Sequence, residues 1–405
     1  MDSYNYIAVN SAGRELKGTI VSDSIEKARE DLKKQGLLIS SLGTASALTR
    51  EVSISFLEKK PKARDMAVFC RQFVSIVDAG VSVVAAFEML PEQTENKKLR
   101  AAISDCRLDM EKGDALAVAM RRHTEVFPDI FVTMVEAGEA SGSLDVSFGR
   151  MATQFEKQEK LHATVKKASI YPIIVCIVAL AVVIGMLTFV IPKFEDMFAD
   201  LGTELPGITL FVLAASQFFQ KKWYILAAIV GAAFVGIKTF KQTDAGRHFF
   251  GKISMKAPLV GNLTVKSASA QMARTLSTLL ASGISMIDAL DICSGTMGNI
   301  YFKEALLAAK EDVAVGNPLS ESFTRTNLFP ALVRHMVGIG EETGDIEKML
   351  DKLADYYEDE VEQATEQVMA ALEPMIIVLL AGIVGTIILS VVMPMGTMYS
   401  ALDNL

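Results

Sequence analysis

Two glutamates are the first candidates for chemistry, because each stands in a short glycine-flanked motif that occurs twice. The motif reads GEASG at 138–142 and GEETG at 340–344. A carboxylate held in this way could act as a general acid or base. No nearby residue supplies a second group with a defined role, so we favour a helix-capping or interface role. The motif residues are Gly138, Glu139 and Gly142 in the first copy and Gly340, Glu341 and Gly344 in the second.

A second candidate is a group of carboxylates on the predicted helix that precedes the last apolar segment. Such a group could bind a divalent cation or a basic partner. Like charges at these spacings are also common on exposed helices, so we favour a solvated helix face and keep metal binding as the alternative. The carboxylates are Asp355, Glu358, Asp359, Glu360, Glu362 and Glu366.

The remaining motifs do not support cofactor chemistry. The 4 cysteines include no C-x-x-C pair, the 4 histidines lack metal-ligand spacing, and there is no P-loop. The glycines of GIGEETG (338–344) superficially resemble a dinucleotide-binding fingerprint. No strand is predicted before them, so a helix break explains them better. We therefore expect no cofactor and no enzymatic activity.

The composition limits the class of protein in which these residues can lie. The chain has 405 residues, of which 51% are hydrophobic and 22% charged, and its mean hydropathy is +0.33. An ordinary charge content beside a positive hydropathy indicates either a very apolar core or membrane spans. The net charge of -8 argues against nucleic acid as a partner. With 4 cysteines, 27 glycines and 11 prolines, a disulfide scaffold and a disordered chain are also excluded.

Two uncharged runs are long enough to cross a membrane. One lies between Lys167 and Lys193 and the other between Glu373 and Asp403. About 20 apolar residues in a helix cross a hydrocarbon core of roughly 30 Å. We therefore predict transmembrane helices at 169–192 and 373–396.

A third apolar run, 223–237, is shorter, and two interpretations of it are open. It could be a buried or interfacial helix, which is the usual reading of such a length. It could also be a span at 218–239 if Lys221 and Lys222 extend outward to the membrane surface. We favour the span, because basic residues dominate 238–266 and acidic residues dominate 193–204. Basic residues mark the cytoplasmic side of a membrane.

This charge distribution predicts a topology. The first residues show neither the basic region nor the apolar stretch of a signal peptide, so we expect a cytoplasmic N-terminus. The predicted order then runs from a cytoplasmic domain at 63–168 through an outer loop at 193–217 to a second cytoplasmic domain at 240–372. An outer tail at 397–405 follows the last span.

An internal repeat supports this topology. Arg71 and Gly80 match Arg274 and Gly283 at one constant offset, and the two glutamate motifs match at an offset one residue shorter. Each copy covers about 110 residues, reads as about six helices, and runs directly into an apolar segment.

Two further sets of residues belong to the apolar segments. The residues that open or close the segments are Tyr171, Pro172, Pro192, Glu373 and Pro374. The candidates for close packing of membrane helices are Gly185, Gly231, Gly382 and Gly385.

A small module precedes the first repeat. Residues 4–9 and 15–21 read as two strands around a turn at 10–13, and 23–35 reads as a helix capped by Asp23. We predict an α/β module at 1–40 and a polar linker at 41–62. The predicted fold is thus an all-α integral membrane protein with two homologous helical bundles, three transmembrane helices and a small α/β N-terminal module.

These motifs together resemble the GspF/PilC family, the inner-membrane platform proteins of type II secretion and type IV pilus machines. The resemblance rests on the duplicated glutamate motifs, on the stretch 166–192 with Tyr171-Pro172 and Pro192, and on the opening stretch 6–39. It implies a non-enzymatic protein of the bacterial inner membrane that couples a cytoplasmic hexameric ATPase to insertion or removal of pilin or pseudopilin subunits. It also implies contacts with pilin transmembrane helices, with other inner-membrane assembly proteins and with further copies of the chain.

The alternative from another class is a multi-pass transporter or membrane enzyme with duplicated regulatory domains. Such a protein normally carries ionisable residues inside its spans. Within 169–192 and 373–396 the single Asp, Glu, Lys, Arg or His is Glu373, at the edge of its span. We therefore favour the platform protein, and among its forms the pilus version.

Overall fold

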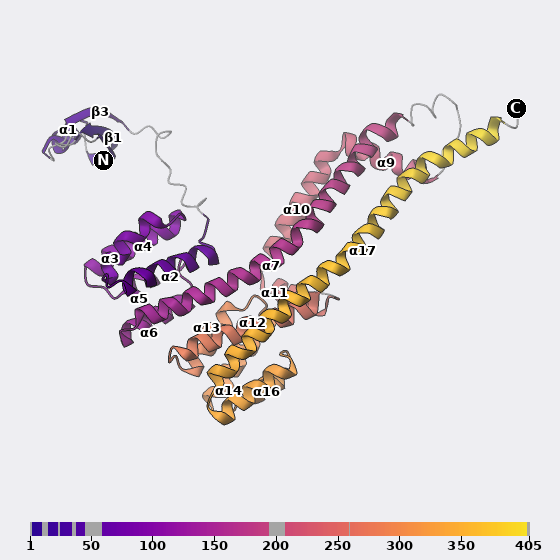
Figure 1. Ribbon diagram of the computed structural model, residues 1–405. Helices are drawn as coiled ribbons and strands as arrows, with labels where there is room; N and C mark the ends of the chain where they lie inside the picture. Colours follow the sequence, from indigo (N-terminus) through magenta and orange to yellow (C-terminus); the bar gives the residue numbers. More distant parts are fainter. Residues whose placement is uncertain are drawn as a thin grey trace. The chain divides into compact units, whose positions relative to one another are not determined.

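A computed structural model describes residues 2–9, 15–22, 25–34, 38–44, 59–193, 207–258 and 260–402. The chain divides into two compact units, Met1–Lys59 and Lys60–Leu405. Figure 1 shows both units, and each is described here by itself.

The described part of the first unit contains an antiparallel sheet and one helix. Strand β1 (Asp2–Val9) lies between β2 (Glu15–Ser22) and β3 (Leu38–Thr44), and α1 (Ile25–Lys34) connects β2 to β3. The third strand therefore extends four residues into the segment predicted as linker. The predicted turn at 10–13, the predicted cap Asp23 and most of the linker lie outside the described residues.

The first repeat consists of six helices around a core of aromatic rings. They are α2 (Ala63–Asp78), α3 (Val83–Gln93), α4 (Lys97–Glu111), α5 (Leu116–Arg121), α6 (Asp129–Ser141) and α7 (Leu144–Gly185). Apolar residues at three- and four-residue spacing turn one face of each helix inward. The buried rings at the centre are Phe69, Phe73, Phe87, Phe127, Phe131, Phe148 and Phe155.

The second repeat has the same six helices in the same order. They are α12 (Val260–Ala281), α13 (Met286–Thr296), α14 (Ile300–Ala314), α15 (Leu319–Thr326), α16 (Ala331–Thr343) and α17 (Ile346–Leu402). This agrees with the helix number predicted from the sequence. A further helix, α11 (Asp244–Lys256), precedes them and was not predicted.

The breaks between helices are duplicated as well. The chain leaves α2 and α12 through Gly80 and Gly283, whose φ angles are 86° and 78°. Only glycine adopts this left-handed conformation without strain. The next helix is then capped by a serine hydroxyl, Ser82 in the first repeat and Ser285 in the second, which accepts a backbone N–H bond.

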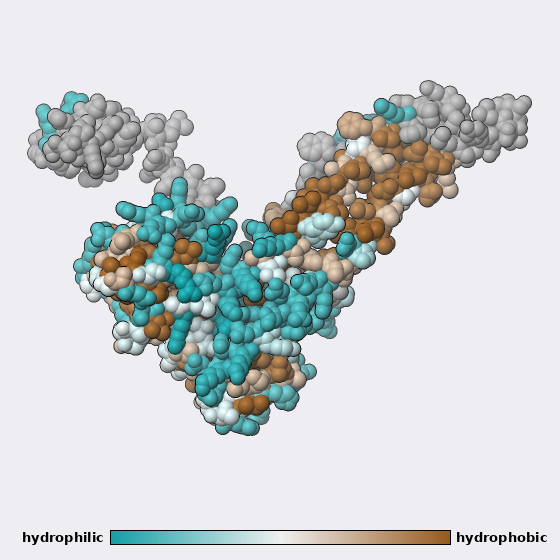
Figure 2. Space-filling view, viewed as in Figure 1, coloured by the Kyte–Doolittle hydropathy of each residue, from teal (hydrophilic) through white to brown (hydrophobic). Residues whose placement is uncertain are grey.

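The last helix of each repeat continues without interruption into its apolar segment. Helix α7 has 42 residues and passes through Pro172, and a π-helical segment, η2 (Met186–Val190), extends it. Helix α17 has 57 residues. These two helices are long and apolar enough to cross a membrane. Figure 2 shows hydrophobic surface along the apolar arm that they form and hydrophilic surface over much of the bundles.

The structure corrects the predicted loop at 193–217. Residues 207–221 form helix α9 (Gly207–Lys221), and the next helix, α10 (Trp223–Gln242), begins after a break at Lys222 rather than near Phe218. The uncharged part of this segment is too short to span a membrane, which is why its sequence reads as a connection. Its helix is instead stabilised by packing, since Val212 and Leu213 are buried against Leu187, Ile191 and Ile387.

Candidate functional site at the junction of the two repeats

The first glutamate motif ends one helix, caps another and allows two helices to approach closely. The N–H of Ser143 donates to the carbonyl of Gly138 at 2.8 Å, and Gly142 has a φ of 71°, which together form a Schellman-type helix end. A methyl group at Gly138 would lie 2.3 Å from Oγ of Ser147 on α7. Glycine at this position therefore permits the close crossing of α6 and α7.

The carboxylate of Glu139 caps helix α5. Its two oxygens accept the backbone N–H groups of Leu116 at 2.8 Å and Ala117 at 3.2 Å. These N–H groups have no partner inside a helix, because they belong to its first turn. The motif thus fixes helices α5, α6 and α7 relative to one another.

The second motif has the same geometry. Glu341 accepts the N–H groups of Leu319 at 2.5 Å and Ser320 at 3.1 Å, and also the hydroxyl of Ser320. A methyl group at Gly340 would lie 2.7 Å from Cα of Ile346, and Gly344 has a φ of 75°. Both glutamates therefore hold helix ends, and their oxygens are already engaged by backbone donors.

An arginine–glutamate pair connects the first and last helices within each repeat. Arg71 on α2 binds both oxygens of Glu156 on α7, at 2.7 and 2.8 Å. Arg274 on α12 binds Glu358 on α17 at 2.8 Å. The two pairs occupy equivalent positions in the repeats. In each repeat this ion pair holds the last, long helix against the first helix, α7 against α2 and α17 against α12.

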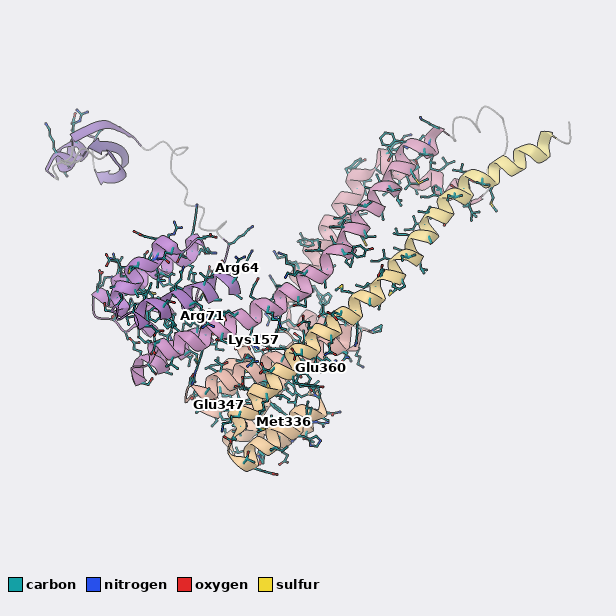
Figure 3. All side chains as sticks on the ribbon, in the orientation of Figure 1. Arg64, Arg71, Lys157, Met336, Glu347 and Glu360 are labelled. Atoms are coloured by element: carbon teal, nitrogen blue, oxygen red, sulfur yellow. The ribbon has the colours of Figure 1, made fainter. Side chains whose placement is uncertain are left out.

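Lys157 joins the two repeats. Its ammonium group lies 2.8 Å from Glu358 and 3.1 Å from Asp355, so a residue of α7 completes the acidic site around Arg274. Figure 3 shows Lys157 on α7. One turn further along, Lys160 lies 3.5 Å from Glu362.

Hydrogen bonds to hydroxyl groups extend this junction along α12. Arg150 donates to the hydroxyl of Ser282 at 2.8 Å. The side-chain amide of Gln154 accepts a hydrogen bond from Thr278 at 3.2 Å and donates to Thr275 at 3.5 Å. One face of α7 therefore lies against the surface formed by α12 and α17.

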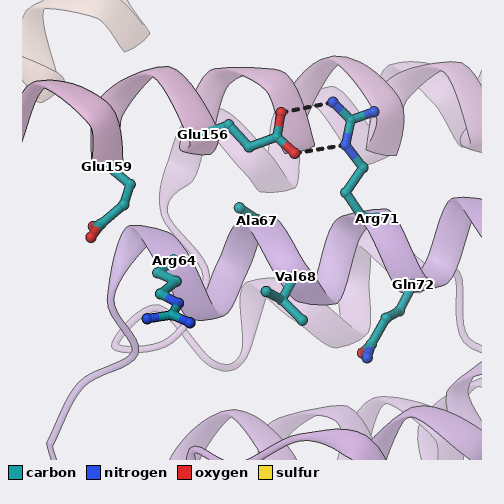
Figure 4. Close-up of a pocket in the computed structure, with 7 residues that line it drawn as sticks. All are labelled: Arg64, Ala67, Val68, Arg71, Gln72, Glu156 and Glu159. Atoms are coloured by element: carbon teal, nitrogen blue, oxygen red, sulfur yellow. Dashed lines mark hydrogen bonds and ion pairs between the residues drawn. The ribbon is translucent and has the colours of Figure 1, made fainter. Parts of the chain in front are cut away.

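The junction favours the charged forms of its residues. Burial opposes the charge of Lys157, but the hydrogen bonds to Glu358 and Asp355 outweigh it and raise the lysine pKa. Burial likewise opposes the charge of Asp355, and the bonds from Lys157 and Arg274 outweigh it and lower the pKa of this carboxyl. In the first repeat, the bond from Arg71, drawn in Figure 4, lowers the pKa of Glu156.

From the sequence we favoured a solvated helix face for the acidic group on α17. The structure shows that some of these carboxylates are paired with basic residues instead. Glu358 is paired with Arg274 and Lys157, and Glu360 lies 2.5 Å from Lys266.

The prediction holds for exposed members such as Asp359 and Glu366 and is wrong for Glu358 and Glu360, because their partners come from other helices, up to about 200 residues away. Among the described residues, no cluster of three or more His, Cys, Asp or Glu side chains could hold a metal ion.

Three of the four cysteines lie in the bundle cores, where they form no disulfide. Burial raises the pKa of Cys70 and Cys293, and it raises the pKa of Cys106 to about 12. A thiol in this state is a poor nucleophile. The fourth, Cys176, is exposed on the apolar part of α7.

Two hydroxyl groups connect helices inside the apolar arm. Thr209 of α9 donates to the carbonyl of Ser390 on α17 at 2.8 Å. Ser216, also on α9, donates to the carbonyl of Leu187 in η2. The π-helical segment leaves carbonyls without their usual partners, and this hydroxyl satisfies one of them. Helix α9 thus links the ends of the two long helices.

The predicted packing glycines have open surroundings within this chain. No atom lies within 4 Å of where a methyl group would stand at Gly185, Gly231, Gly382 or Gly385. The residues at the boundaries of the apolar segments are also accessible. Tyr171, Glu373 and Pro374 are exposed, and Pro172 and Pro192 are half-buried.

The sequence interpretation missed the junction as a site. Arg71 was matched to Arg274 from the sequence, but no pattern there singled out Lys157. The signal was present, because Glu156 and Glu358 match at the same offset as the glutamate motifs. A duplicated arginine and a duplicated glutamate on the first and last helices of a repeat indicate an ion pair between those helices.

Comparisons with known proteins match this architecture. The family model "Type II secretion system (T2SS), protein F" matches residues 69–192 and 272–394, and the model "Type II secretion system protein F, N-terminal domain" matches residues 1–42. Each of the two longer matches covers most of one repeat together with its apolar segment.

Relatives align over nearly the whole chain. The chain is 36% identical to the type IV pilus assembly protein PilC of Thermus thermophilus, with 98% of each chain covered. It is 37% identical to the protein of the same name from Pseudomonas aeruginosa, with 90% and 96% covered. It is 30% identical to the type II secretion system protein F of Vibrio cholerae, with 97% and 98% covered.

Proposed function

Because the chain belongs to the type II secretion system protein F family, we propose that it is the inner-membrane platform protein of a type IV pilus machine. In this role it couples a cytoplasmic assembly ATPase to the insertion and removal of pilin subunits. The pilus version is favoured by the relatives named PilC, which are 36% and 37% identical, against 30% for the secretion protein.

One observation carries the coupling role. Helices α7 and α17 each run unbroken from a helical bundle into the apolar arm. Lys157 of α7 binds Glu358 of α17 in the part of these helices that belongs to the bundles. A force applied to either bundle is therefore transmitted along a rigid helix into the membrane. A protein that only anchored the machine would not need continuous helices.

The proposed topology has three crossings, with the N-terminus and both repeats in the cytoplasm. Helices α7 and α17 provide two crossings, and α10 provides the third. Support for α10 comes from its exposed apolar side chains, among them Ile229, Val230, Phe234 and Val235. Reporter fusions at Asp200 and Gly298 test this arrangement. We expect them on opposite sides of the membrane, and finding both on one side would rule it out.

The proposed partners follow from the surfaces of this chain. The bundles would contact the ATPase, and the apolar arm would contact pilin transmembrane helices and other inner-membrane assembly proteins. The open surroundings of Gly185 and Gly385 suit close approach of another helix. Leucine at either position should impair pilus assembly and leave membrane insertion intact, and normal piliation in both variants would count against these contacts. We also include further copies of the chain among the partners.

A deletion strain tests the function itself. Cells lacking this chain should have no surface pili and should keep normal levels of pilin and ATPase, and expression of the chain should restore piliation. The chain should also co-purify with the assembly ATPase from detergent extracts. Normal piliation in the deletion strain, with loss of protein secretion instead, would assign the chain to a type II secretion machine.

A further inference from the structure

Helix α11 contacts α10, α12 and α14 and lies where α10 meets the second repeat (Figure 1). One face of it is held against the repeat by Asn299, whose side-chain amide donates to the carbonyl of Gly251 and to the hydroxyl of Ser254, both at 3.1 Å. Gly251 is buried, and a methyl group there would lie 3.0 Å from Oδ1 of Asn299. This close approach fixes which face of α11 turns outward.

The corner between α10 and α11 is fixed as well. The hydroxyl of Thr243 accepts the N–H of Gly246 at 3.1 Å and donates to the carbonyl of Phe240 at 2.7 Å. A methyl group at Gly246 would lie 1.8 Å from the same carbonyl oxygen. The end of α10 therefore sets the direction in which α11 leaves it.

The outward face of α11 combines large apolar side chains with lysines. Phe249 and Ile253 are 56% and 46% exposed, and Lys252 and Lys256 are exposed beside them. Residues three, four and seven positions apart share one face of a helix, so all four side chains lie together. No acidic residue occurs between residues 245 and 256. We call these four residues the outward face.

The apolar part of the outward face continues onto α10. The ring of Phe240, which is 43% exposed, lies 6.2 Å from the rings of Phe249 and Phe250. The ammonium group of Lys241 lies 4.8 Å from the centre of the Phe250 ring. Further apolar side chains of α10, such as Phe234, are exposed above this corner. The outward face is therefore part of a larger apolar surface.

Basic charge exceeds acidic charge in this region. Between residues 238 and 256 the chain has five basic residues and one acidic residue. The acidic residue, Asp244, lies 3.7 Å from Arg247, and Glu304 of α14 lies 3.2 Å from His248. Within the described part of the chain, the four lysines of this region form no ion pair with one another's neighbours; they are Lys238, Lys241, Lys252 and Lys256.

The outward face lies near the level at which α17 becomes apolar. Helix α12 runs antiparallel to α17, because Lys266 contacts Glu360 whereas Arg274, later in α12, contacts Asp351, earlier in α17. The beginning of α12 therefore lies roughly 10 Å of helix from Glu373. Thr264, in the first turns of α12, donates to the carbonyl of Ser254 on α11 at 3.1 Å. Helix α11 thus packs at the end of the second repeat that is closest to the membrane.

These features match a helix that lies on a membrane surface. The headgroup layer on each side of a bilayer is about 5 to 8 Å thick, so lysine side chains at this level reach it. Such helices insert apolar side chains at the boundary between headgroups and acyl chains, and their basic residues bind anionic lipids. An acidic protein would account for the lysines alone. The continuity of Phe249 with the exposed apolar surface of α10 favours lipid.

We propose that the outward face of α11 binds anionic phospholipid headgroups on the cytoplasmic surface of the membrane. Phe249 and Ile253 insert at the headgroup boundary, and Lys252 and Lys256 bind the phosphates. The inference rests on the membrane placement in the proposed function. It adds a lipid contact that holds the second repeat against the membrane beside the apolar arm.

Spin labelling of the full chain in nanodiscs tests this contact. A nitroxide on Ile253→Cys reports insertion, because membrane-soluble oxygen and a water-soluble nickel chelate relax it differently. A Cys176→Ser background removes the exposed cysteine. In bilayers of equal parts phosphatidylglycerol and phosphatidylcholine the label should lie at headgroup depth. In phosphatidylcholine alone it should be exposed to water.

The matched control carries the label at Val146→Cys on α7. This side chain is 47% exposed, against 46% for Ile253. It stands about 35 Å of helix before the predicted start of the span at residue 169. The control label should be exposed to water in both bilayers.

Removal of the lysines provides a second arm. Lys252→Gln and Lys256→Gln should each lower the ratio of inserted to water-exposed label by about fivefold in the anionic bilayer. Lys352→Gln changes an exposed lysine of α17 that stands about 30 Å of helix before Glu373, and it should leave the ratio unchanged.

Water exposure of the label at residue 253 in the anionic bilayer would overturn the proposal. Equal insertion in both bilayers would also overturn it, because the lipid charge would then play no part. Shielding that appears only when the cytoplasmic ATPase is added would assign the outward face to a protein and reject the lipid contact.

A further label, at Val378→Cys on the apolar part of α17, separates two levels of failure. This side chain is 71% exposed. If its label lies in the hydrocarbon core while the label at residue 253 is in water, the α11 contact is rejected and the proposed membrane placement stands. If both labels are in water, the placement is rejected as well. Piliation is measured separately and bears only on the proposed function.

Discussion

The ammonium group of Lys157 lies 2.8 Å from a carboxylate oxygen of Glu358, and this contact joins the last helix of the first repeat to the last helix of the second. Glu358 already binds Arg274 of its own repeat. One carboxylate therefore takes part both in fastening a bundle and in connecting the two bundles. The stability of this junction is open to direct measurement.

Removing the Lys157 ammonium should weaken the junction. Lys157→Met keeps most of the apolar side chain and leaves Glu358, whose side chain is 11% exposed, with one cationic partner fewer. We expect a loss of about 1 to 2 kcal/mol of unfolding free energy, because Lys157 is partly exposed and part of its interaction is screened. Denaturant unfolding of the detergent-solubilised protein measures it. Lys160→Met is the control, since its ion pair is longer and more exposed and should change little. Equal effects of both variants would contradict the assigned role.

The motif glutamates should behave as helix caps. Glu139→Ala and Glu341→Ala each remove the acceptor of backbone N–H groups and should cost about 1 kcal/mol. Gln at either position keeps an acceptor oxygen, so Glu139→Gln and Glu341→Gln should retain most of the stability and full piliation. Complete loss of piliation in a Gln variant of normal stability would indicate a chemical role for the carboxylate instead.

Close helix approach should make Gly340 intolerant of any side chain. In Gly340→Ala the new methyl group would lie 2.7 Å from Cα of Ile346, so backbone must move. We expect a cost of about 1 to 3 kcal/mol, typical of overpacking. Gly149→Ala is the matched control, because Gly149 lies in a helix and has no atom within 4 Å of the added group. That variant should be neutral or stabilised by about 0.5 to 1 kcal/mol. Thermal unfolding compares the two, and similar melting temperatures would contradict the packing described.

The junction should lose stability at both extremes of pH. The pKa of Asp355 is lowered in the folded chain, so its contribution is present above its unfolded pKa of about 4 and is lost as the pH falls through the folded value. The pKa of Lys157 is raised, so its contribution is present below about pH 10 and is lost as the pH rises through the folded value. Melting temperatures of the parent and of Lys157→Met should therefore differ most between about pH 5 and pH 10. A difference that stays constant from pH 2 to 12 would contradict this linkage.

Local patterns predicted much of this structure. The spacing of Met66, Phe69, Phe73 and Val77 is typical of one apolar helix face, and glycine at 80 followed by serine at 82 is typical of a helix end and the cap of the next helix. The repeat predicted that the second half would have the same helices. These features depend on neighbours within a few residues, which a single sequence displays.

The remaining features depend on contacts between distant residues. Glu358 reads as one more exposed acid on a charged helix until Arg274 and Lys157 are brought to it by the fold. Helix α9 is stabilised by Leu187 and Ile387, which lie on other helices. The repeat marks only the Arg274–Glu358 pair, and no local pattern marks Lys157 or the partners of α9, so the acidic face and the loop at 193–217 were misread.

The central claim is that the apolar arm contacts pilin helices while the machine assembles a pilus. Photo-cross-linking in living cells tests it most directly, with a photoreactive residue placed at Val378 of α17, which is 71% exposed. The same residue at Ile387, which is 4% exposed and packs against α9, is the control. A platform role predicts that pilin subunits are captured from Val378 and not from Ile387, and only in cells with an active assembly ATPase. Failure to capture pilin from Val378, or capture that is unchanged without the ATPase, would contradict it.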